Sequence, residues 1–134
     1  MTAAIIATVI IVGALAAAAR YLVTRLFGNS RFPWAVLVVN VSASGIGGAV
    51  LALSARAEIS SDVQLIVLTG LCGGLSTFST LSVETIQLVL EGKTAVAVRS
   101  VLANLAFGVG AAAAAYALVM LLGLAGLATW AMVR

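Results

Sequence analysis

The chain alternates four long apolar runs with short polar segments. Each run is long enough to reach the roughly 20 apolar residues that a helix needs to cross the hydrocarbon core of a bilayer. The runs cover about residues 3–27, 34–54, 62–90 and 94–122. This pattern predicts an all-α membrane protein, with four transmembrane helices that form a single domain over residues 1–134.

Composition agrees with the pattern and bounds the function. Hydrophobic residues make up 63% of the chain and charged residues 8%, whereas soluble domains are about half apolar and a quarter charged. We therefore expect a multi-pass protein of the inner (plasma) membrane. The net charge of +3 comes from few residues near the predicted helix ends. Such charges concern topology and lipid headgroups, and no basic cluster predicts a nucleic-acid partner.

The chain is poor in the residues that most enzymes use. It has one cysteine, Cys72, and no histidine. An internal disulfide is excluded, and so are the usual zinc sites and the Ser-His-Asp arrangement. We therefore predict that the protein is not an enzyme.

One stretch within the third run, residues 69–84, has an unusual composition. It holds three glycines and six hydroxyl side chains where a plain membrane helix would carry leucines. Glycines permit a departure from the helix, but at membrane depth the freed backbone needs partners from protein or from a water-filled cavity. A helix broken at mid-membrane is a usual ion site. A small-residue packing face is the alternative, and the run of hydroxyls favours the ion site.

Two further apolar runs carry polar stripes. In the second run Asn40 and Ser44 share a helical face, and in the fourth run Ser100, Asn104 and Gly108 follow one another at a spacing of four. A buried amide in hydrocarbon needs a partner. Each stripe therefore either joins its helix to another or lines a polar pathway, and the pattern alone leaves both open.

Arg20 and Glu84 are charged residues that lie well inside the apolar runs. Arg20 ends a face of small residues, Gly13, Ala16 and Ala17, and it either faces protein or extends to the membrane interface. Glu84 follows the glycine-hydroxyl stretch. About seven residues at 1.5 Å each separate it from the hydroxyl cluster, so we expect it at the mouth of a pathway.

The stretch Gly70-Leu-Cys-Gly-Gly-Leu-Ser-Thr-Phe-Ser-Thr-Leu81, with Glu84 after it, resembles the third helix of the CrcB/Fluc family of fluoride channels. That family carries Gly-x-x-Gly-Gly-x-Thr-Thr-Phe-Ser-Thr-Phe there, followed shortly by a glutamate. Residues 13–21 resemble the family's small-residue helix ending in Arg-Tyr, and residues 38–41 resemble its Val-Asn segment. The length and the four-helix layout agree over the whole chain.

The resemblance implies an antiparallel dual-topology dimer with two narrow pores that export fluoride passively and so limit its toxicity. It also implies a structural sodium ion at the dimer centre, held by the backbone carbonyls of Gly73 and Ser76. The pore residues that it implies are Asn40, Phe78, Ser79, Thr80, Ser100 and Asn104.

Two positions depart from the family pattern. Leu81 stands where a second pore phenylalanine is expected, and Ser100 stands where a tyrosine usually lies. Both changes touch the pore lining, so the chain could form a homodimer or need a paralogous subunit that supplies an intact set. A non-conducting structural or assembly subunit also stays open. A small multidrug exporter is disfavoured because its mechanism needs a membrane carboxylate, and the first run has none.

Charge distribution bears on the same question. The basic residues, Arg20 aside, divide into Arg25, Arg31, Lys93 and Arg99 on one side and Arg56 and Arg134 on the other. The positive-inside tendency then places the first and third loops in the cytoplasm. A single preferred orientation favours the heterodimer, since a dual-topology homodimer would show almost no bias.

Overall fold

The computed structural model describes residues 2–27 and 32–132, with side chains as far as residue 126. All of its regular elements are helical. In chain order they are α1 (Ala3–Phe27), α2 (Trp34–Ala55), α3 (Ser61–Leu65), the π-helix η1 (Ile66–Cys72), α4 (Gly73–Leu75), α5 (Phe78–Leu90) and α6 (Thr94–Met132).

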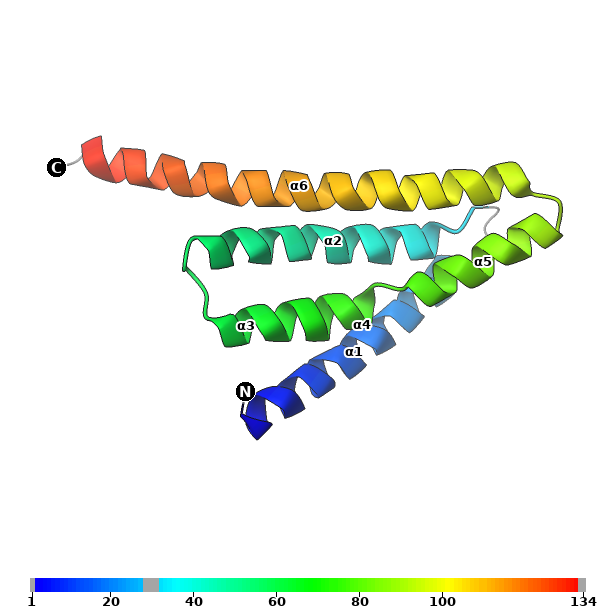
Figure 1. The fold of residues 1–134 in the computed structure, drawn as a ribbon, viewed down its shortest axis with the longest axis horizontal. Helices are drawn as coiled ribbons and strands as arrows, with labels where there is room; N and C mark the ends of the chain where they lie inside the picture. Colours follow the sequence, from blue (N-terminus) through cyan, green and yellow to red (C-terminus); the bar gives the residue numbers. More distant parts are fainter. Residues whose placement is uncertain (1, 28–31, 133–134) are drawn as a thin grey trace.

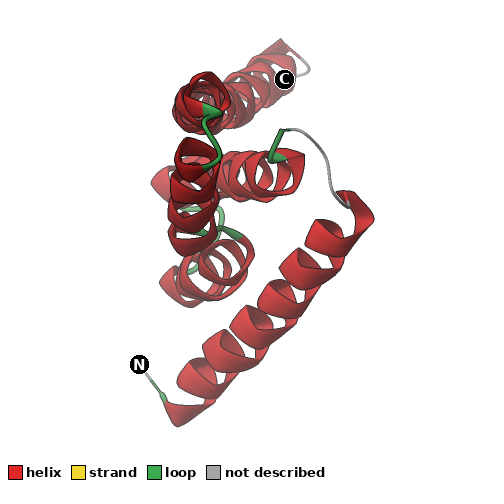
Figure 2. Ribbon diagram, turned by 90° about the vertical axis from the view of Figure 1, so that its right-hand side faces the viewer, coloured by secondary structure: helices red, strands yellow, loops and turns green. Residues whose placement is uncertain are grey.

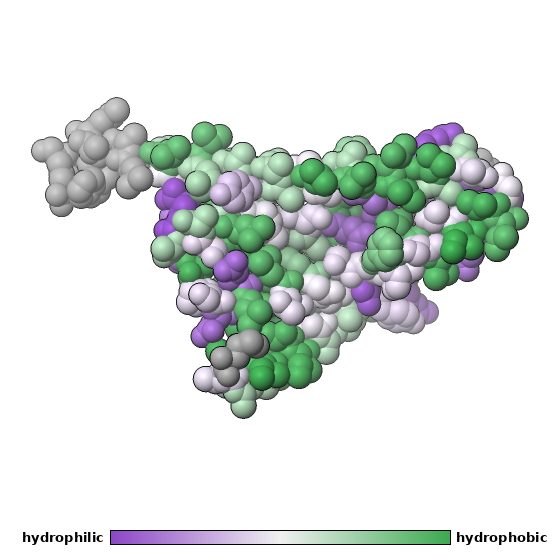
Figure 3. Space-filling view, viewed as in Figure 1, coloured by the Kyte–Doolittle hydropathy of each residue, from purple (hydrophilic) through white to green (hydrophobic). Residues whose placement is uncertain are grey.

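Four helical segments are long and apolar enough to span a membrane. They are Ala3–Phe27, Trp34–Ala55, Ser61–Leu90 and Thr94–Gly126. The predicted all-α membrane protein with four spans is confirmed at this level. Apolar residues cover much of the face seen in Figure 3, with hydrophilic residues near the helix ends and in a small group beside α6.

The helices form two main contacts, one between α2 and α6 and one between α1 and the third span. Most of α2 lies along α6, and α1 packs against η1 and α4 (Figure 1). Figure 2 shows α1 running obliquely along the outside of the bundle. α5 leans away from α4 and contacts α6 instead. The chain therefore brings the end of α4 and the start of α5 between α1, α2 and α6.

Small residues set the distance between α2 and α6. A Cβ added at Gly48 would overlap the backbone of Ala112, and one added at Gly108 would lie 3.4 Å from the Ser44 hydroxyl oxygen. Because lipid tails are as apolar as leucine, membrane helices associate through such close packing. The two predicted polar stripes thus meet each other across this contact.

A second small-residue contact joins α1 to the third span. A Cβ added at Gly74 would overlap the Gly13 carbonyl oxygen and lie 2.9 Å from the Ala16 Cβ atom. A Cβ at Gly70 would lie 3.1 Å from the Val9 carbonyl oxygen. The predicted face of small residues on the first helix therefore serves helix packing.

The last helix is longer than the sequence pattern predicts. We expected it to end near residue 122, but α6 continues to Met132. Gly123 and Gly126 only weaken a helix locally, and the single proline of the chain lies at position 33. No strong helix terminator follows residue 122, so the helical ladder continues through these glycines.

Two helices end in the same left-handed turn, one with glycine and one without. After α5, Gly92 has φ +75, and after α2, Ala57 has φ 55. In both turns the next N–H bonds back to a carbonyl five residues earlier: Lys93 N–H to Leu88 O at 2.8 Å, and Glu58 N–H to Leu53 O at 3.0 Å. This bond pattern is the Schellman motif, which favours glycine.

We therefore expect Ala57→Gly to stabilise the protein. Left-handed backbone costs an L-residue roughly 1–2 kcal/mol, and the extra freedom of glycine in the unfolded chain offsets part of this, which leaves a gain of about 0.5–1 kcal/mol. Gly92→Ala is the reciprocal variant, since a Cβ there meets no described atom within 4 Å, and it should lose a similar amount. Thermal unfolding of both variants in the same detergent tests the pair. Equal shifts in the same direction would contradict the expectation.

Candidate functional site

The third span is interrupted between α4 and α5. Ser76 (φ −74, ψ 156) and Thr77 (φ −149, ψ 118) are extended, so two consecutive residues leave the helical ladder. We expected glycines to permit such a departure, but Gly73 is itself helical at φ −64 and ψ −37. The interruption therefore uses backbone angles open to any residue, while Gly70 and Gly74 serve the contact with α1.

The backbone groups of the interruption are all hydrogen-bonded. Ser76 N–H donates to Cys72 O at 2.9 Å, and Ser76 O accepts from Arg20 Nη1 at 2.9 Å. Thr77 N–H donates to Asn40 Oδ1 at 2.7 Å, and Thr77 O accepts from Asn40 Nδ2 at 3.2 Å. In a soluble protein, water can bond to backbone groups that leave a helix, but lipid cannot. Here side chains of α1 and α2 bond to these groups instead.

Arg20 faces protein, which is one of the two positions open to it from the sequence. Its guanidinium reaches from α1 to Ser76 O, and its side chain is half-buried. Within the described residues the ion pairs are Arg56–Glu58 and Lys93–Glu91, so no carboxylate neutralises Arg20 there. Its positive charge is therefore held beside the interruption by a single backbone carbonyl.

We expect Arg20→Met to destabilise the protein by about 1.5–3 kcal/mol, because a charge-assisted hydrogen bond is lost and Ser76 O stays buried without that partner. Arg25→Met on the same helix is the matched control. Arg25 is exposed and lies over the Tyr21 ring at 5.8 Å. Unfolding temperatures of both variants in nanodiscs test the expectation, and an equal loss in the two would refute a specific role for Arg20.

Hydroxyl groups cluster where α5 begins. Thr77 is the N-cap: its Oγ1 accepts from Thr80 N–H at 3.1 Å, and its hydroxyl donates to Thr80 Oγ1 at 2.9 Å. Ser79 Oγ lies 3.3 Å from Thr77 Oγ1. Unpaired N–H groups and the helix dipole make a helix N-terminus favourable for anions. The cluster therefore combines hydroxyl donors with positive potential.

Thr77 is the buried centre of this arrangement, 6% exposed, and sequence reasoning did not single it out. A threonine directly before a new helix is a recognisable N-cap signal. That signal was hidden because the surrounding pattern reads as one continuous apolar span.

The two polar stripes form one hydrogen-bonded chain. Asn40 Nδ2 donates to Asn104 Oδ1 at 2.9 Å, and Asn104 Nδ2 donates to Ser100 O at 3.0 Å. Ser100 is fully buried, and its hydroxyl has no hydrogen-bond partner among the described residues. Asn40 therefore joins α2 to α6 and to the interruption at once.

Other predicted site residues lie apart from this chain of bonds. The Phe78 side chain is 82% exposed at the start of α5, so one chain alone does not enclose it. Glu84 lies further along α5, half-buried, and its Oε2 has no partner within the described part of the chain. The structure thus places Asn40, Ser79 and Thr80 against Thr77. Asn104 joins through Asn40, and Phe78 lies at the surface.

The carbonyls predicted to hold sodium have different surroundings. Thr77 N–H would be the helical donor to Gly73 O, but it donates to Asn40 instead, so the carbonyl of Gly73, the first residue of α4, lacks that donor. Ser76 O already accepts a hydrogen bond from Arg20, so a sodium ion would share this carbonyl with the guanidinium. Carbonyls at a helix break suit a sodium ion, and the described residues hold no group of three or more His, Cys, Asp or Glu that could bind a metal. The donor chemistry fits sodium, with Gly73 as the freer ligand.

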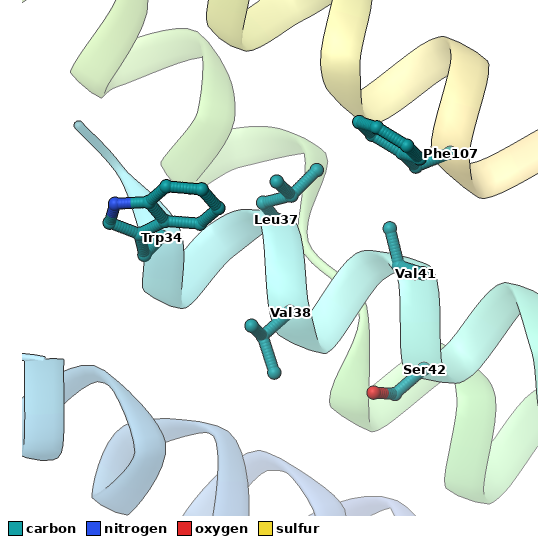
Figure 4. A pocket seen from close by; sticks show the side chains of 6 residues that line it. All are labelled: Trp34, Leu37, Val38, Val41, Ser42 and Phe107. Carbon is teal, nitrogen blue, oxygen red and sulfur yellow. The ribbon is translucent and has the colours of Figure 1, made fainter.

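An apolar groove lies beside the site, between α2 and α6 (Figure 4). Its volume is about 350 Å³, and its lining consists of Trp34, Leu37, Val38, Val41, Ser42 and Phe107. Ser42 is the polar member of this lining. The groove therefore offers few donors for an ion, namely the Ser42 hydroxyl and the Trp34 indole N–H.

Comparison with known proteins bears directly on this geometry. A family model described as CrcB-like protein, camphor resistance (CrcB), matches residues 7–129. The protein named fluoride-specific ion channel FluC 1 of Nitrobacter hamburgensis is 35% identical over 114 residues, which cover 82% of this chain and 90% of that protein. Fluoride-specific ion channel FluC of Shewanella putrefaciens is 40% identical over 97 residues (69% and 77%). Fluoride-specific ion channel FluC of Nitrobacter winogradskyi is 37% identical over 103 residues (74% and 82%).

Proposed function

This chain belongs to the CrcB-like family, and from that premise we infer that it is a fluoride-selective channel of the plasma membrane. It conducts fluoride passively and so limits fluoride toxicity in the cell. The observation that carries the proposal is the interruption of the third span, where hydroxyls surround the N-terminus of α5. The relatives named as fluoride-specific channels support the same ion.

The chemistry of the site suits a small, strongly hydrated anion. A fluoride pore must replace water with donors, and hydroxyls and amides provide them without the tight binding of a lysine. A phenylalanine ring carries positive potential on its edge, so Phe78 can contact fluoride weakly. Weak contacts at several places let an ion leave as well as enter. Passive conduction is the simpler mechanism, because α1 carries no carboxylate for proton coupling.

We further propose that two copies, or this chain and a paralogue, form an antiparallel dual-topology dimer with the interruption at mid-membrane. The exposed Phe78 supports this arrangement, because a pore residue needs a second wall. A sodium ion at the dimer centre would take the Gly73 and Ser76 carbonyls of both subunits. In sodium-free buffer the dimer should then unfold at a lower temperature, and an unchanged unfolding temperature would remove the sodium ion from the proposal.

Fluoride efflux from liposomes, followed with a fluoride electrode, tests the function. Purified protein should dissipate a fluoride gradient and leave a chloride gradient intact. Phe78→Ile should stop the flux, whereas Phe107→Ile should not, although the Phe107 side chain is also exposed, at 60%. Comparable chloride flux would refute a fluoride-selective channel. Flux only in the presence of a paralogue would assign the chain to a heterodimer, and its absence there too would favour a non-conducting assembly subunit.

Orientation tests the heterodimer separately. The proposal rests on the charge bias and on the changes at Leu81 and Ser100; Arg31 and Arg134, which contribute to the bias, lie outside the described residues. Cysteines are introduced singly into the first and second loops of a Cys72→Ser background and labelled from outside. We expect labelling of the second loop only. Equal labelling of both loops, with robust flux from this chain alone, would establish a homodimer.

A further inference from the structure

We propose that the groove between α2 and α6 binds an acyl chain of an anionic phospholipid, and that Arg99 holds the phosphate of that lipid at the mouth of the groove. The site combines an apolar face of α2, one aromatic side chain from each helix and an unpaired arginine on α6. It takes a lipid as its ligand, so it does not depend on which ion the protein conducts.

The lining of the groove follows one face of α2. Its α2 members recur at intervals of three and four, which places them side by side along the helix: Trp34, Leu37, Val38, Val41 and Ser42. Phe107 borders the groove from α6 (Figure 4). Both Val38 and Phe107 are exposed, so the groove is open along the helix pair. An extended hydrocarbon chain fits an open apolar groove of this kind.

Trp34 marks the polar end of the groove. It is the first residue of α2 and is half exposed, and its ring lies 4.8 Å from that of Phe32. Figure 4 shows its six-membered ring toward Leu37 and its indole nitrogen on the far side. Tryptophan is enriched at membrane–water interfaces because its ring has an apolar body and a polar N–H. The groove therefore runs from headgroup level at Trp34 toward the membrane interior.

Arg99 lies at the level of this mouth. The hydrogen bond from Asn40 to Asn104 and the backbone contact at Gly48 both join residues 64 positions apart, so α2 and α6 run parallel. The same offset places Arg99 beside the first turn of α2, one residue after Trp34.

Arg99 also lies on the groove side of α6. It precedes Phe107 by eight residues, which at 3.6 residues per turn puts the two side chains within about a quarter turn of each other. The rise between them is about 12 Å. An arginine side chain can lie along apolar surface and extend its guanidinium toward the interface. The guanidinium can therefore meet a phosphate while the acyl chain of the same lipid passes Phe107.

Arg99 needs such a partner. Its side chain is exposed, and neither ion pair of the described residues includes it. It lies inside the span Thr94–Gly126, between the exposed apolar side chains of Val98 and Leu102. A charge among lipid-facing side chains is costly unless it is paired or reaches the interface. A phosphate suits the guanidinium because it accepts two parallel hydrogen bonds from it.

Quenching of Trp34 fluorescence by brominated acyl chains tests the site. The chain has two tryptophans, so a Trp130→Phe background leaves Trp34 as the single fluorophore. Bilayers of phosphatidylcholine receive brominated phosphatidylglycerol or brominated phosphatidylcholine at equal mole fraction. One arginine near the surface favours an anionic lipid by roughly fivefold, so the first lipid should show an apparent affinity about fivefold higher. Equal affinities would overturn the proposal. Quenching by neither lipid would mean that a second copy covers the groove, which would also overturn it.

Two arginine variants separate a site from diffuse charge attraction. Arg99→Gln should abolish the preference for phosphatidylglycerol. Arg25→Gln is the matched control, because Arg25 is also exposed but lies on α1, over the Tyr21 ring. This variant should keep the preference. Equal losses in the two variants would show that the basic residues attract anionic lipid collectively, and the assignment to Arg99 would fail.

Thermal unfolding tests the acyl-chain part of the site. A lipid that binds the folded protein raises its unfolding temperature, so phosphatidylglycerol added to the protein in neutral detergent should raise it. Val38→Trp fills the groove and should lose most of this rise. Val109→Trp makes the same change at an exposed position of α6 outside the lining and should keep it. An equal rise in the two variants, or an equal rise with glycerol phosphate in place of the lipid, would show that no acyl chain occupies the groove.

Discussion

Asn40→Asp should abolish fluoride flux and lower the free energy of unfolding by about 3 kcal/mol or more. The carboxylate can still accept from Thr77 N–H. Its second oxygen, however, replaces the amide nitrogen that donates to Thr77 O and to Asn104 Oδ1, so both of these acceptors lose their donor. Leaving buried acceptors unsatisfied costs roughly 1–3 kcal/mol each, and a buried unpaired charge adds to this. The sequence alone predicts lost flux with assembly intact, whereas the structure adds a loss of stability.

The matched control is Gln64→Glu. It is also an amide-to-carboxylate change on a membrane helix, but there the amide oxygen, Oε1, accepts from the Ser54 hydroxyl at 2.7 Å. The carboxylate can keep that bond, so we expect a small effect on unfolding and on flux. Unfolding in denaturant and fluoride efflux are measured on both variants. Similar behaviour of the two would mean that the amide nitrogen of Asn40 contributes nothing.

Gly48→Val should separate α2 from α6 and prevent stable assembly. A Cβ at position 48 overlaps the carbonyl oxygen, carbonyl carbon and Cα of Ala112, and backbone cannot rotate out of the way as a side chain can. Overpacking typically costs 1–3 kcal/mol, and occasionally more; we expect about 3 kcal/mol or more here because the two helices must move apart. Asn40 lies two turns from Gly48, so the same movement lengthens its bond to Asn104 and stops conduction.

Gly110→Val on α6 is the control, since a Cβ there meets no described atom within 4 Å. It shares any intrinsic cost of valine in a helix. The elution volume of the purified protein on size exclusion and its fluoride flux report the outcome. Ala112→Gly should not rescue Gly48→Val, because the overlap is with backbone. A rescue, or equal effects of the two valine variants, would show that the contact is not close.

The four spans and the polar stripes could be predicted from the sequence because each depends on local spacing. Length and apolar composition define a membrane helix, and a spacing of four places Ser100, Asn104 and Gly108 on one face. The partner of each stripe could not be predicted. That Asn40 meets Asn104 depends on the register between α2 and α6, which the backbone contact at Gly48 sets.

Two residues of the stretch 69–84 have extended backbone, but they are not its glycines. Glycines pointed to it, yet Ser76 and Thr77 leave the helix and the neighbouring glycines stay helical. The π-helix η1 just before it was also not expected, since no residue pattern identifies such segments. Side-chain partners from α1 and α2 determine where the helix opens, and those partners are distant in sequence.

The length of α6 has a consequence for the surrounding lipid. α2 and α6 run in register, as Asn40 lies beside Asn104 and Gly48 beside Ala112, so α6 extends past the end of α2 (Figure 1). Its 39 residues span about 58 Å at 1.5 Å per residue, against roughly 30 Å of hydrocarbon.

Arg56, at the end of α2, lies against Gly123 and forms an ion pair with Glu58, and we expect these charges to lie at headgroup level. Leu121, Leu122 and Leu124 are exposed there. Apolar side chains at that level draw acyl chains outward or pull the helix into the interface by tilting. We therefore expect the lipid annulus to be thicker beside the end of α6 than beside α2.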